Sequence, residues 1–227
     1  MDKTIYVRSI MIENYNPSKI PFLNIIYHDD DILVLNKPSG LLSVPGREVK
    51  HHDSLQSRAI EKYPSALNVH RLDMDTSGII IMALNKAAHR HLSIQFQERN
   101  VEKTYRARVY GILKEDQGLI DLPLICDWPN RPKQIVDFDV GKPSQTKWKV
   151  MARNDQETTL ELTPITGRSH QLRVHLQNIN HPILGDRFYG HEDALKMSDH
   201  LCLHATALTI SHPVTLAKMT FKSEVDF

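Results

Sequence analysis

The sequence predicts an α+β fold in which a mixed, largely antiparallel sheet carries a few helices on its faces. Three stretches support this class. Residues 79–84 form an apolar run rich in β-branched side chains, which is typical of a buried strand. Residues 86–97 place apolar side chains four positions apart, as an amphipathic helix does. Residues 104–110 alternate apolar and charged side chains, which indicates a half-exposed strand.

The N-terminal third of the chain predicts an arm, two strands and a short helix. Residues 1–22 contain two X-Pro pairs, which favour extended or turn backbone and indicate an arm that lies on the domain. An acidic turn joins two predicted strands at 25–27 and 32–35. A short helix is expected over 53–63, with Asp53 at a possible N-cap and Pro64 after its end.

The C-terminal half predicts more strands and one further helix. Residues 127–133 hold two prolines and are expected to form an exposed loop. A helix is expected after Ser169, which can cap it, because apolar residues recur at 172, 176 and 179. Arg168 would lie at the entrance of that helix. Strands are expected at 146–151, 158–165, 201–210 and 219–221.

The composition is that of an ordinary globular protein. The 227 residues are 41% hydrophobic and 24% charged, which allows a sizeable core. The net charge of +1 excludes a general basic coat, so any nucleic-acid binding must use local patches. The two cysteines have no CxxC spacing, and neither a leader pattern nor an apolar run of membrane-spanning length is present. We expect a soluble cytoplasmic protein with reduced thiols.

Cofactor and metal signatures are missing from the sequence. Thirteen histidines are present, but His170 and His175 are five positions apart and would not easily share one metal ion on a helix or a strand. HExxH, GxGxxG, the P-loop and the GxSxG elbow are absent. We therefore expect no metal and no cofactor.

The loop before the buried strand is the first candidate for an active site. Residues 70–78 read HRLDMDTSG and carry two carboxylates, a guanidinium and an imidazole on backbone that the strand holds in place. Asp73 or Asp75 could serve as a nucleophile or a base. Either aspartate could equally make a turn by accepting hydrogen bonds from its own backbone. Physical reasoning alone does not choose between the two aspartates.

Several motifs, in order along the chain, make it resemble a known family. Residues 70–78 are similar to the HRLDxxTSG signature of the RluA family of pseudouridine synthases. Other segments typical of that family are NKPxGL, K-x-Y-x-A, GRxHQLRVH, HPILGD and LHA. They are matched at residues 36–41, 103–107, 167–175, 181–186 and 203–205.

This resemblance implies a pseudouridine synthase fold with a catalytic cleft across the sheet. It divides the chain into the arm, 1–22, and one catalytic domain, 23–227, without the S4 domain of several relatives. The implied reaction converts specific uridines of structured RNA to pseudouridine without a cofactor. Residues 122–134 resemble the loop of a family member that acts on both ribosomal and transfer RNA, which implies a loop of large-subunit ribosomal RNA and the anticodon stem-loop of certain tRNAs as targets. A monomer with no membrane contact and no obligate protein partner is expected.

The resemblance also implies three catalytic residues. Asp73 matches the catalytic carboxylate, which attacks or deprotonates the ribose, whereas Asp75 falls on a variable position. Arg168 matches an arginine that holds Asp73 ionised by charge-assisted hydrogen bonds, with an ordinary ion pair at the cleft floor as the alternative. Tyr105 matches a pocket tyrosine that stacks on the target base and moves a proton late in the reaction, although its face, shared with Ala107, is also typical of a core.

Expected RNA contacts follow from the need to flip the target uridine out of a folded RNA. By resemblance, Arg71 enters the RNA where the uridine left, and His70 contacts the same backbone. A surface phosphate contact is the alternative for Arg71. A local cationic track and a stacking aromatic side chain are further candidates. The track would comprise Arg106, Arg108, Arg131 and Lys133, and the aromatic side chain is that of Trp128.

Two other functions remain open from the sequence. A catalytically silent RNA-binding module could keep the same fold, although intact Asp73, Tyr105 and Arg168 argue against it. A glycosidase could use Asp73 and Asp75 as acid and nucleophile. Two aspartates separated by one residue within a turn are poorly placed to flank a sugar, which disfavours this alternative.

Overall fold

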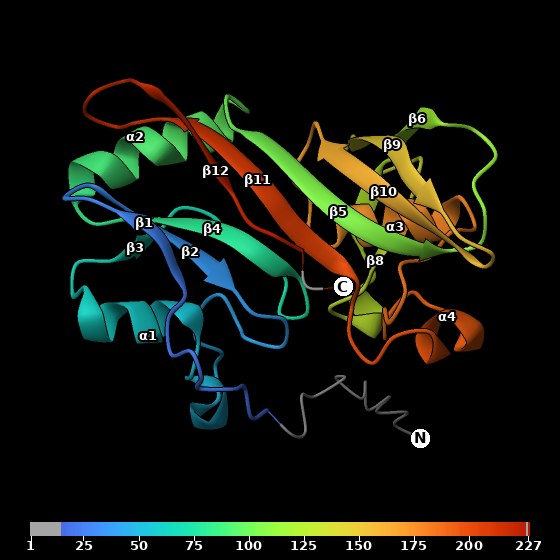
Figure 1. Ribbon diagram of the computed structural model, residues 1–227, viewed down its shortest axis with the longest axis horizontal. Coiled ribbons are helices and arrows are strands. Elements are labelled where there is room, and N and C mark those ends of the chain that lie inside the picture. The colour runs from blue at the N-terminus through green and yellow to red at the C-terminus, as the bar shows by residue number, and fades with distance from the viewer. Residues whose placement is uncertain (1–14, 226) are drawn as a thin grey trace, which may run out of the picture.

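A computed structural model describes residues 15–225 and residue 227, which are organised around one large sheet (Figure 1). The N-terminal half supplies strands β1 (Ile25–His28), β2 (Ile32–Lys37), β3 (Leu67–Asn68) and β4 (Ser77–Ala83). Its helices are α1 (Leu55–Lys62) and α2 (Lys86–Gln97), and a 3-10 turn covers Val49–His51. The predicted strands and helices of this half are confirmed.

The C-terminal half continues the sheet and adds a small hairpin. Its sheet strands are β5 (Glu102–Tyr110), β6 (Gln117–Asp121), β9 (Gln145–Arg153), β10 (Glu157–Pro164), β11 (Leu203–Ser211) and β12 (Lys218–Lys222). Strands β7 (Leu124–Cys126) and β8 (Gln134–Val136) pair separately, with a 3-10 turn at Trp128–Asn130 between them. The helices are α3 (Gln171–Asn178) and α4 (Glu192–Lys196).

The order of the strands brings distant parts of the chain together. The sheet runs β1-β2-β4-β11-β5-β10-β9-β6, with β12 beside β11 and β3 beside β4. Among the strands of the described residues, β4 and β11 form the one parallel pair. Figure 1 shows β11 and β5 crossing the middle of the molecule between the two halves. The predicted α+β class, with a mixed and largely antiparallel sheet, is confirmed.

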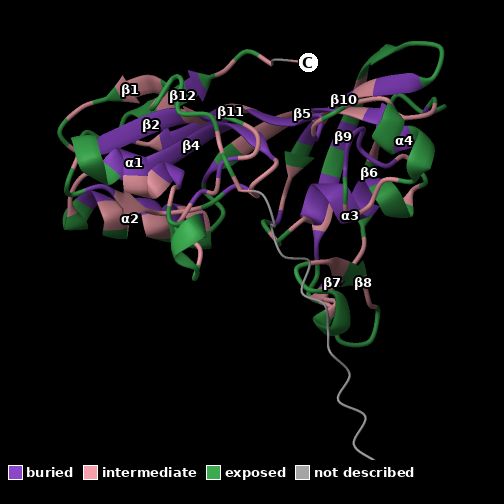
Figure 2. Cartoon of the chain, turned by 90° about the horizontal axis from the view of Figure 1, so that it is seen from below, coloured by how far each residue is buried: buried purple, intermediate pink, exposed green. Residues whose placement is uncertain are grey.

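Alternating residues of β2 and β4 build cores on both faces of the sheet. One face packs against α1 through Leu33, Leu35, Ile80, Met82, Leu55 and Ala59. The other face packs against α2 through Ile32, Val34, Ile79, Ile81, Ala88 and Leu92. Figure 2 shows both helices beside these buried strands. Because every residue of β4 is buried, its sequence is a continuous apolar run rather than an alternating one.

Gly78 lets the loop of residues 70–78 enter β4 next to β11. Its φ is +106°, which side-chain-bearing residues rarely adopt, and a Cβ on it would stand 2.4 Å from the carbonyl oxygen of Ala205. Only glycine therefore fits where the two parallel strands approach each other. This contact fixes the end of the 70–78 loop on the sheet.

The described part of the predicted arm contacts the domain. The Tyr15 hydroxyl donates to the carbonyl of Asp53 at 2.8 Å and accepts from the Leu42 amide at 2.9 Å. Residues 1–14 of the predicted arm lie outside the described residues. The division into an arm and a single domain stays a prediction, although one sheet spans both halves.

The predicted cap of α3 was wrong. The residue before the helix is His170, in a left-handed conformation with φ +52°, and no side chain hydrogen-bonds to the first turn from that position. Gln171 instead turns back, and its Oε1 accepts from the Arg168 amide at 3.0 Å and from the Thr166 hydroxyl at 2.7 Å. The helix start is therefore tied to the preceding loop through Gln171 rather than through Ser169.

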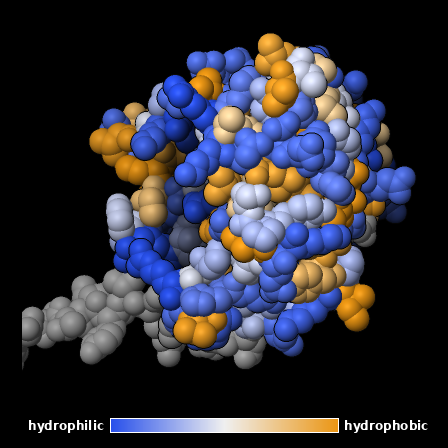
Figure 3. Space-filling model, turned by 90° about the vertical axis from the view of Figure 1, so that its left-hand side faces the viewer, coloured by the Kyte–Doolittle hydropathy of each residue, from blue (hydrophilic) through white to orange (hydrophobic). Residues whose placement is uncertain are grey.

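The surface seen from the α1 and α2 end is mixed in character. Figure 3 shows hydrophobic side chains there in small groups separated by hydrophilic ones. No helix within the described residues combines the length and apolar character needed to span a membrane.

Candidate active site

Asp73 lies in the loop before β4, at the wall of a small cavity. The cavity has a volume of about 90 Å³, and the Asp73 side chain is 27% exposed. The structure thus brings four of the predicted site residues together at the end of the buried strand. The polar side chains that line the cavity include those of Arg71, Asp73, Lys103, Tyr105, Arg168, His170 and Arg173.

A buried lysine anchors the Asp73 loop to β2. The Lys37 ammonium donates to the carbonyls of Pro38, Leu41 and Met74 at 2.9, 2.7 and 2.8 Å. Its side chain is fully buried, and burial lowers the pKa of Lys37 to about 7 against the opposing charges of the nearby aspartates. The NKPxGL motif therefore holds the backbone that carries Asp73 in place.

The cation that contacts Asp73 is Arg173, in the first turn of α3. Its Nη1 lies 3.4 Å from Oδ2 of Asp73, and its Nε and Nη2 donate to the two oxygens of Asp186 at 2.8 and 2.7 Å. Burial alone would lower the pKa of Arg173, but its hydrogen bonds and charge attraction with Asp186 raise that pKa above its usual range. Arg173 thus keeps a permanent positive charge beside Asp73.

The structure places Arg173, and not the predicted Arg168, in contact with Asp73. Within the described residues, no hydrogen bond or ion pair joins the Arg168 side chain to Asp73, although both line the cavity. Arg168 precedes the helix, whereas Arg173 is 2% exposed and points inward from it. Both arginines lie within the GRSHQLRVH stretch at 167–175, so the motif contained the right residue, but the helix start decides which one faces Asp73.

His170 adds a second contact at Asp73. Its Nε2 lies 3.9 Å from Oδ2 of Asp73, and its Nδ1 lies 2.7 Å from the Tyr189 hydroxyl. Because that hydroxyl accepts from the Gln134 amide, we assign its own proton to the bond with Nδ1, which leaves the histidine proton on Nε2. Burial lowers the pKa of His170. A neutral imidazole with its N–H toward Asp73 results.

Tyr105 serves the cavity and the core at once. It lines the cavity from β5 and also packs against the apolar clusters on its own face of the sheet. Burial and the charge of Asp73 raise the pKa of the Tyr105 hydroxyl, so it remains protonated at neutral pH. The position of Tyr105 is therefore compatible with both interpretations from the sequence, a pocket tyrosine and a core tyrosine.

Two predicted RNA contacts and their neighbours surround a groove next to the cavity. Arg71 is exposed and lines both spaces, and the groove has a volume of about 360 Å³. Arg131 lines the groove, and its guanidinium stacks on Trp128 with 4.6 Å to the ring centroid. Trp128 is 64% exposed, and Lys133 follows it on the same β7–β8 connection. Of these four side chains, those of Arg71 and Arg131 line the groove, whereas Trp128 and Lys133 are not among its lining residues.

Three predicted RNA contacts do not line the cavity. His70 accepts from the Ile81 amide at 3.1 Å and its ring stacks on Phe96, and burial lowers its pKa to about 3. Arg108 forms an ion pair of 2.6 Å with Glu157. Arg106 and Arg108 alternate with Tyr105 along β5, so they project from the opposite face and do not line the cavity. Their geometry does not support the predicted contacts with RNA at this site.

Asp75 is turned away from the cavity. Its two oxygens accept from Nη2 of Arg187 at 2.8 and 3.0 Å, and it does not line the space that contains Asp73. The glycosidase alternative needs both carboxylates on one substrate, so this arrangement argues against it. Of the two aspartates, Asp73 is the one that lines the cavity.

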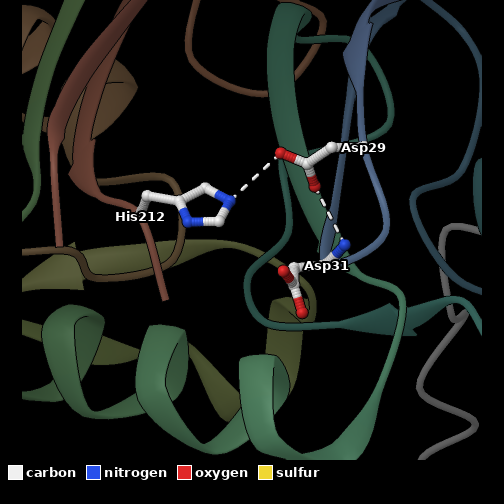
Figure 4. A group of neighbouring side chains, drawn as sticks. All are labelled: Asp29, Asp31 and His212. Atoms are coloured by element: carbon white, nitrogen blue, oxygen red, sulfur yellow. Dashed lines mark hydrogen bonds and ion pairs between the residues drawn. The ribbon is translucent and has the colours of Figure 1, made fainter. Parts of the chain in front are cut away.

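A second group of titratable residues lies far from this loop. Asp29, Asp31 and His212 place one possible metal-ligand atom each within 4.8 Å of one another (Figure 4). Nδ1 of His212 accepts backbone N–H groups, so its Nε2 carries the proton and donates to Asp29 at 3.0 Å. Asp29 also accepts from Tyr27, Asp31 and Ile32. The cluster fits a hydrogen-bonded tie between two turns better than a metal site.

Comparison of the fold defines the class of protein. A solved structure, human RNA Pseudouridylate Synthase Domain Containing 1, matches with a TM-score of 0.76 over 92% of this chain and 86% of that chain, at 29% sequence identity. The fold is thus that of a pseudouridylate synthase domain, as the motifs predict.

The sequence comparisons then give the family. A family profile described as RNA pseudouridylate synthase matches residues 31–178, and the chain belongs to this family. Dual-specificity RNA pseudouridine synthase RluA of Escherichia coli (strain K12) is 56% identical over 217 residues, 95% of this chain and 99% of that protein. The protein of the same name from Haemophilus influenzae is 54% identical over 214 residues, 94% and 98% of the two chains. The predicted family and the predicted class of enzyme, an isomerase acting on RNA, are confirmed.

Proposed function

We propose that this RNA pseudouridine synthase uses Asp73 as its catalytic carboxylate. The observation that carries the proposal is the position of Asp73, whose carboxylate borders the cavity and contacts a guanidinium that Asp186 holds in place. In the reaction the N-glycosidic bond of a uridine breaks, the uracil rotates, and a C-glycosidic bond forms through C5. C5 then loses its proton and N1 gains one, so that the product is an isomer of the substrate. Asp73 attacks or deprotonates the ribose so that the uracil leaves and returns.

The surrounding groups supply the charge and the stacking that this role needs. Arg173 supplies a positive charge 3.4 Å from Oδ2 of Asp73. Tyr105 keeps its proton and offers a ring and a hydroxyl inside the cavity. The target uridine reaches them by leaving the RNA stack, and Arg71, which is exposed at the mouth, enters the gap.

We further propose that the enzyme acts on two kinds of RNA in the cytoplasm as a monomer. The proposed targets are a stem-loop of large-subunit ribosomal RNA and the anticodon stem-loop of certain tRNAs. Support comes from two relatives above half identity that are named dual-specificity enzymes, and from the groove that extends from the cavity to Arg131. Light scattering of the purified protein tests the monomer.

Tritium release tests this function directly. The purified protein is incubated, without added cofactor, with each of the two stem-loops labelled with tritium at uracil C5, and with a stem-loop of scrambled loop sequence. Release from both targets and not from the scrambled RNA is expected. Binding without release would indicate a silent RNA-binding module, and free uracil would indicate a glycosidase. Either of these results would contradict the proposal.

A further inference from the structure

We propose that Lys103 and Arg168 form an anion subsite for a phosphate next to the target uridine. This inference rests on the proposed function, because it describes how the same cavity holds its RNA. Lys103 lies on β5 two residues before Tyr105, so both side chains project from one face of the strand. Both line the cavity that contains Asp73, and Arg168 lines it from the loop before α3.

The Lys103 ammonium has no counter-charge of its own. Within residues 15–225 and 227, it makes no hydrogen bond or ion pair, although its side chain is half-buried. Its Nζ lies 3.5 Å from the point where a Cβ of Gly167 would stand, in space that this glycine leaves open. Burial and the charge of Arg99 lower the pKa of Lys103. An anion in the cavity would offset the cost of this desolvated, unpaired charge.

Arg168 is also without an anionic partner. Its Nε is buried and has no hydrogen-bond partner, while its backbone amide is occupied by Gln171. Five other arginines of the described residues pair with carboxylates: Arg58, Arg108, Arg153, Arg173 and Arg187. The Nε of Arg106 is also buried without a partner, but Arg106 does not line the cavity. Arg168 thus has a buried N–H group without a partner, and it lines the same cavity as the unpaired Lys103 ammonium. A ligand that supplies acceptor oxygens would satisfy both groups.

A phosphate of the RNA fits this pair of cations. The phosphates on either side of the target uridine are the anions nearest to the ribose that Asp73 must reach. A guanidinium offers several N–H donors to phosphate oxygens, and an ammonium adds a point charge. Contacts of this kind position a nucleic acid without reading its sequence. The subsite would therefore set how far the flipped nucleotide enters the cavity. It would do so in the same way for both proposed targets, because a phosphate contact does not depend on sequence.

A charge-deletion cycle tests the subsite. RNA binding is measured for three proteins that all carry Asp73→Asn, which prevents turnover. The first has no further change, the second also carries Lys103→Met, and the third carries Lys114→Met. The third is the control, because Lys114 is exposed and lines neither the cavity nor the groove. Each protein is titrated with an unmodified stem-loop and with stem-loops that carry one neutral methylphosphonate, on the 5′ or the 3′ side of the target uridine. Thermal unfolding of each variant is recorded in parallel.

One of the two methylphosphonates should weaken binding by about tenfold when Lys103 is present and by less than about twofold in Lys103→Met. Arg168→Met should show the same coupling at the same linkage, and Lys114→Met should behave like its parent. The melting temperature of Lys103→Met should not fall, because no internal partner is lost. The subsite would be overturned if each methylphosphonate weakened binding by the same factor with Lys103 present and in Lys103→Met. It would also be overturned if a lowered melting temperature explained the weaker binding of Lys103→Met. Tritium release by the parent enzyme reports on the proposed function separately.

Discussion

Asp73 and Arg173 are joined by a contact of 3.4 Å although they lie 100 positions apart in the chain. The same guanidinium forms two shorter hydrogen bonds with Asp186, whose side chain is fully buried. Asp186 therefore holds Arg173, and Arg173 in turn faces Asp73. Three of the motifs that the sequence contains meet in this one chain of contacts.

Arg173 should matter for both folding and turnover, and Arg168 for substrate binding alone. Arg173→Met leaves Asp186 buried without its partner, so we expect the free energy of unfolding to fall by about 3 to 5 kcal/mol and turnover to be lost. Arg168→Met should lower stability by less than about 1 kcal/mol and weaken RNA binding. Urea unfolding and tritium release measure the two effects.

The double variant Arg173→Met with Asp186→Asn separates these roles of Arg173. It removes the buried charge together with its partner, so stability should recover in part while turnover stays lost. Normal turnover in either Arg173 variant would show that the contact with Asp73 is only structural.

Gly78→Ala should damage the fold much more than Gly40→Ala. Both glycines have positive φ, but a Cβ on Gly78 meets Ala205 backbone atoms, whereas a Cβ on Gly40 has nothing within 4 Å. We expect a loss of about 3 kcal/mol or more for Gly78→Ala, from strain plus overlap, and about 1 to 2 kcal/mol for Gly40→Ala, from strain alone. Equal losses in denaturant unfolding would show that β4 and β11 separate easily.

His70 should make the protein less stable in mild acid. Its folded pKa of about 3 lies below the usual value of 6.5, so the unfolded chain binds a proton between these values and the folded one does not. Stability should therefore fall as the pH drops below about 6.5, with His70 contributing roughly 2 kcal/mol of the loss at pH 5. In His70→Gln this part of the pH dependence should vanish, while the shares of His170 and His175 remain. The measurement is the free energy of unfolding as a function of pH for the parent protein and for His70→Gln. Parallel curves for the two proteins would contradict the assignment of this pH dependence to His70.

Arg71 should matter most when the uridine is stacked in a folded RNA. Its exposed guanidinium contacts no carboxylate in the described residues and is free to fill the gap left by flipping. Unstacking costs a few kcal/mol, so Arg71→Ala should slow turnover of a stem-loop by at least about tenfold and that of an unstructured oligonucleotide far less. A uniform loss on both RNAs would favour the alternative of a plain phosphate contact.

Local signals predicted the central strands and helices, and they failed where elements are short and exposed. The apolar run of β4 and the helical stripe of α2 are strong patterns because buried faces need them. In β6 only Ile120 is buried, and α4 has five residues with only Ala194 buried. Such elements depend on pairing with neighbours rather than on their own pattern, so the sequence did not reveal them.

The candidate active site could likewise be predicted from the sequence only in part. Asp73 and Tyr105 could be placed from motifs, but the partner of Asp73 depends on where α3 begins. Gln171 and His170 set that start through contacts with distant residues. For Arg106 and Arg108 the signal was present. Their alternation with Tyr105 already placed them on the other face of β5, away from the cavity.

The most direct test of the account compares Asp73→Asn with Asp75→Asn in the tritium-release assay. The two substitutions are chemically identical and two positions apart, but only Asp73 lines the cavity, while Asp75 pairs with the exposed Arg187. Asp73→Asn should abolish release and keep RNA binding, and Asp75→Asn should keep both. Release by Asp73→Asn, or its loss in a folded, RNA-binding Asp75→Asn protein, would contradict the assignment of Asp73 as the one catalytic carboxylate.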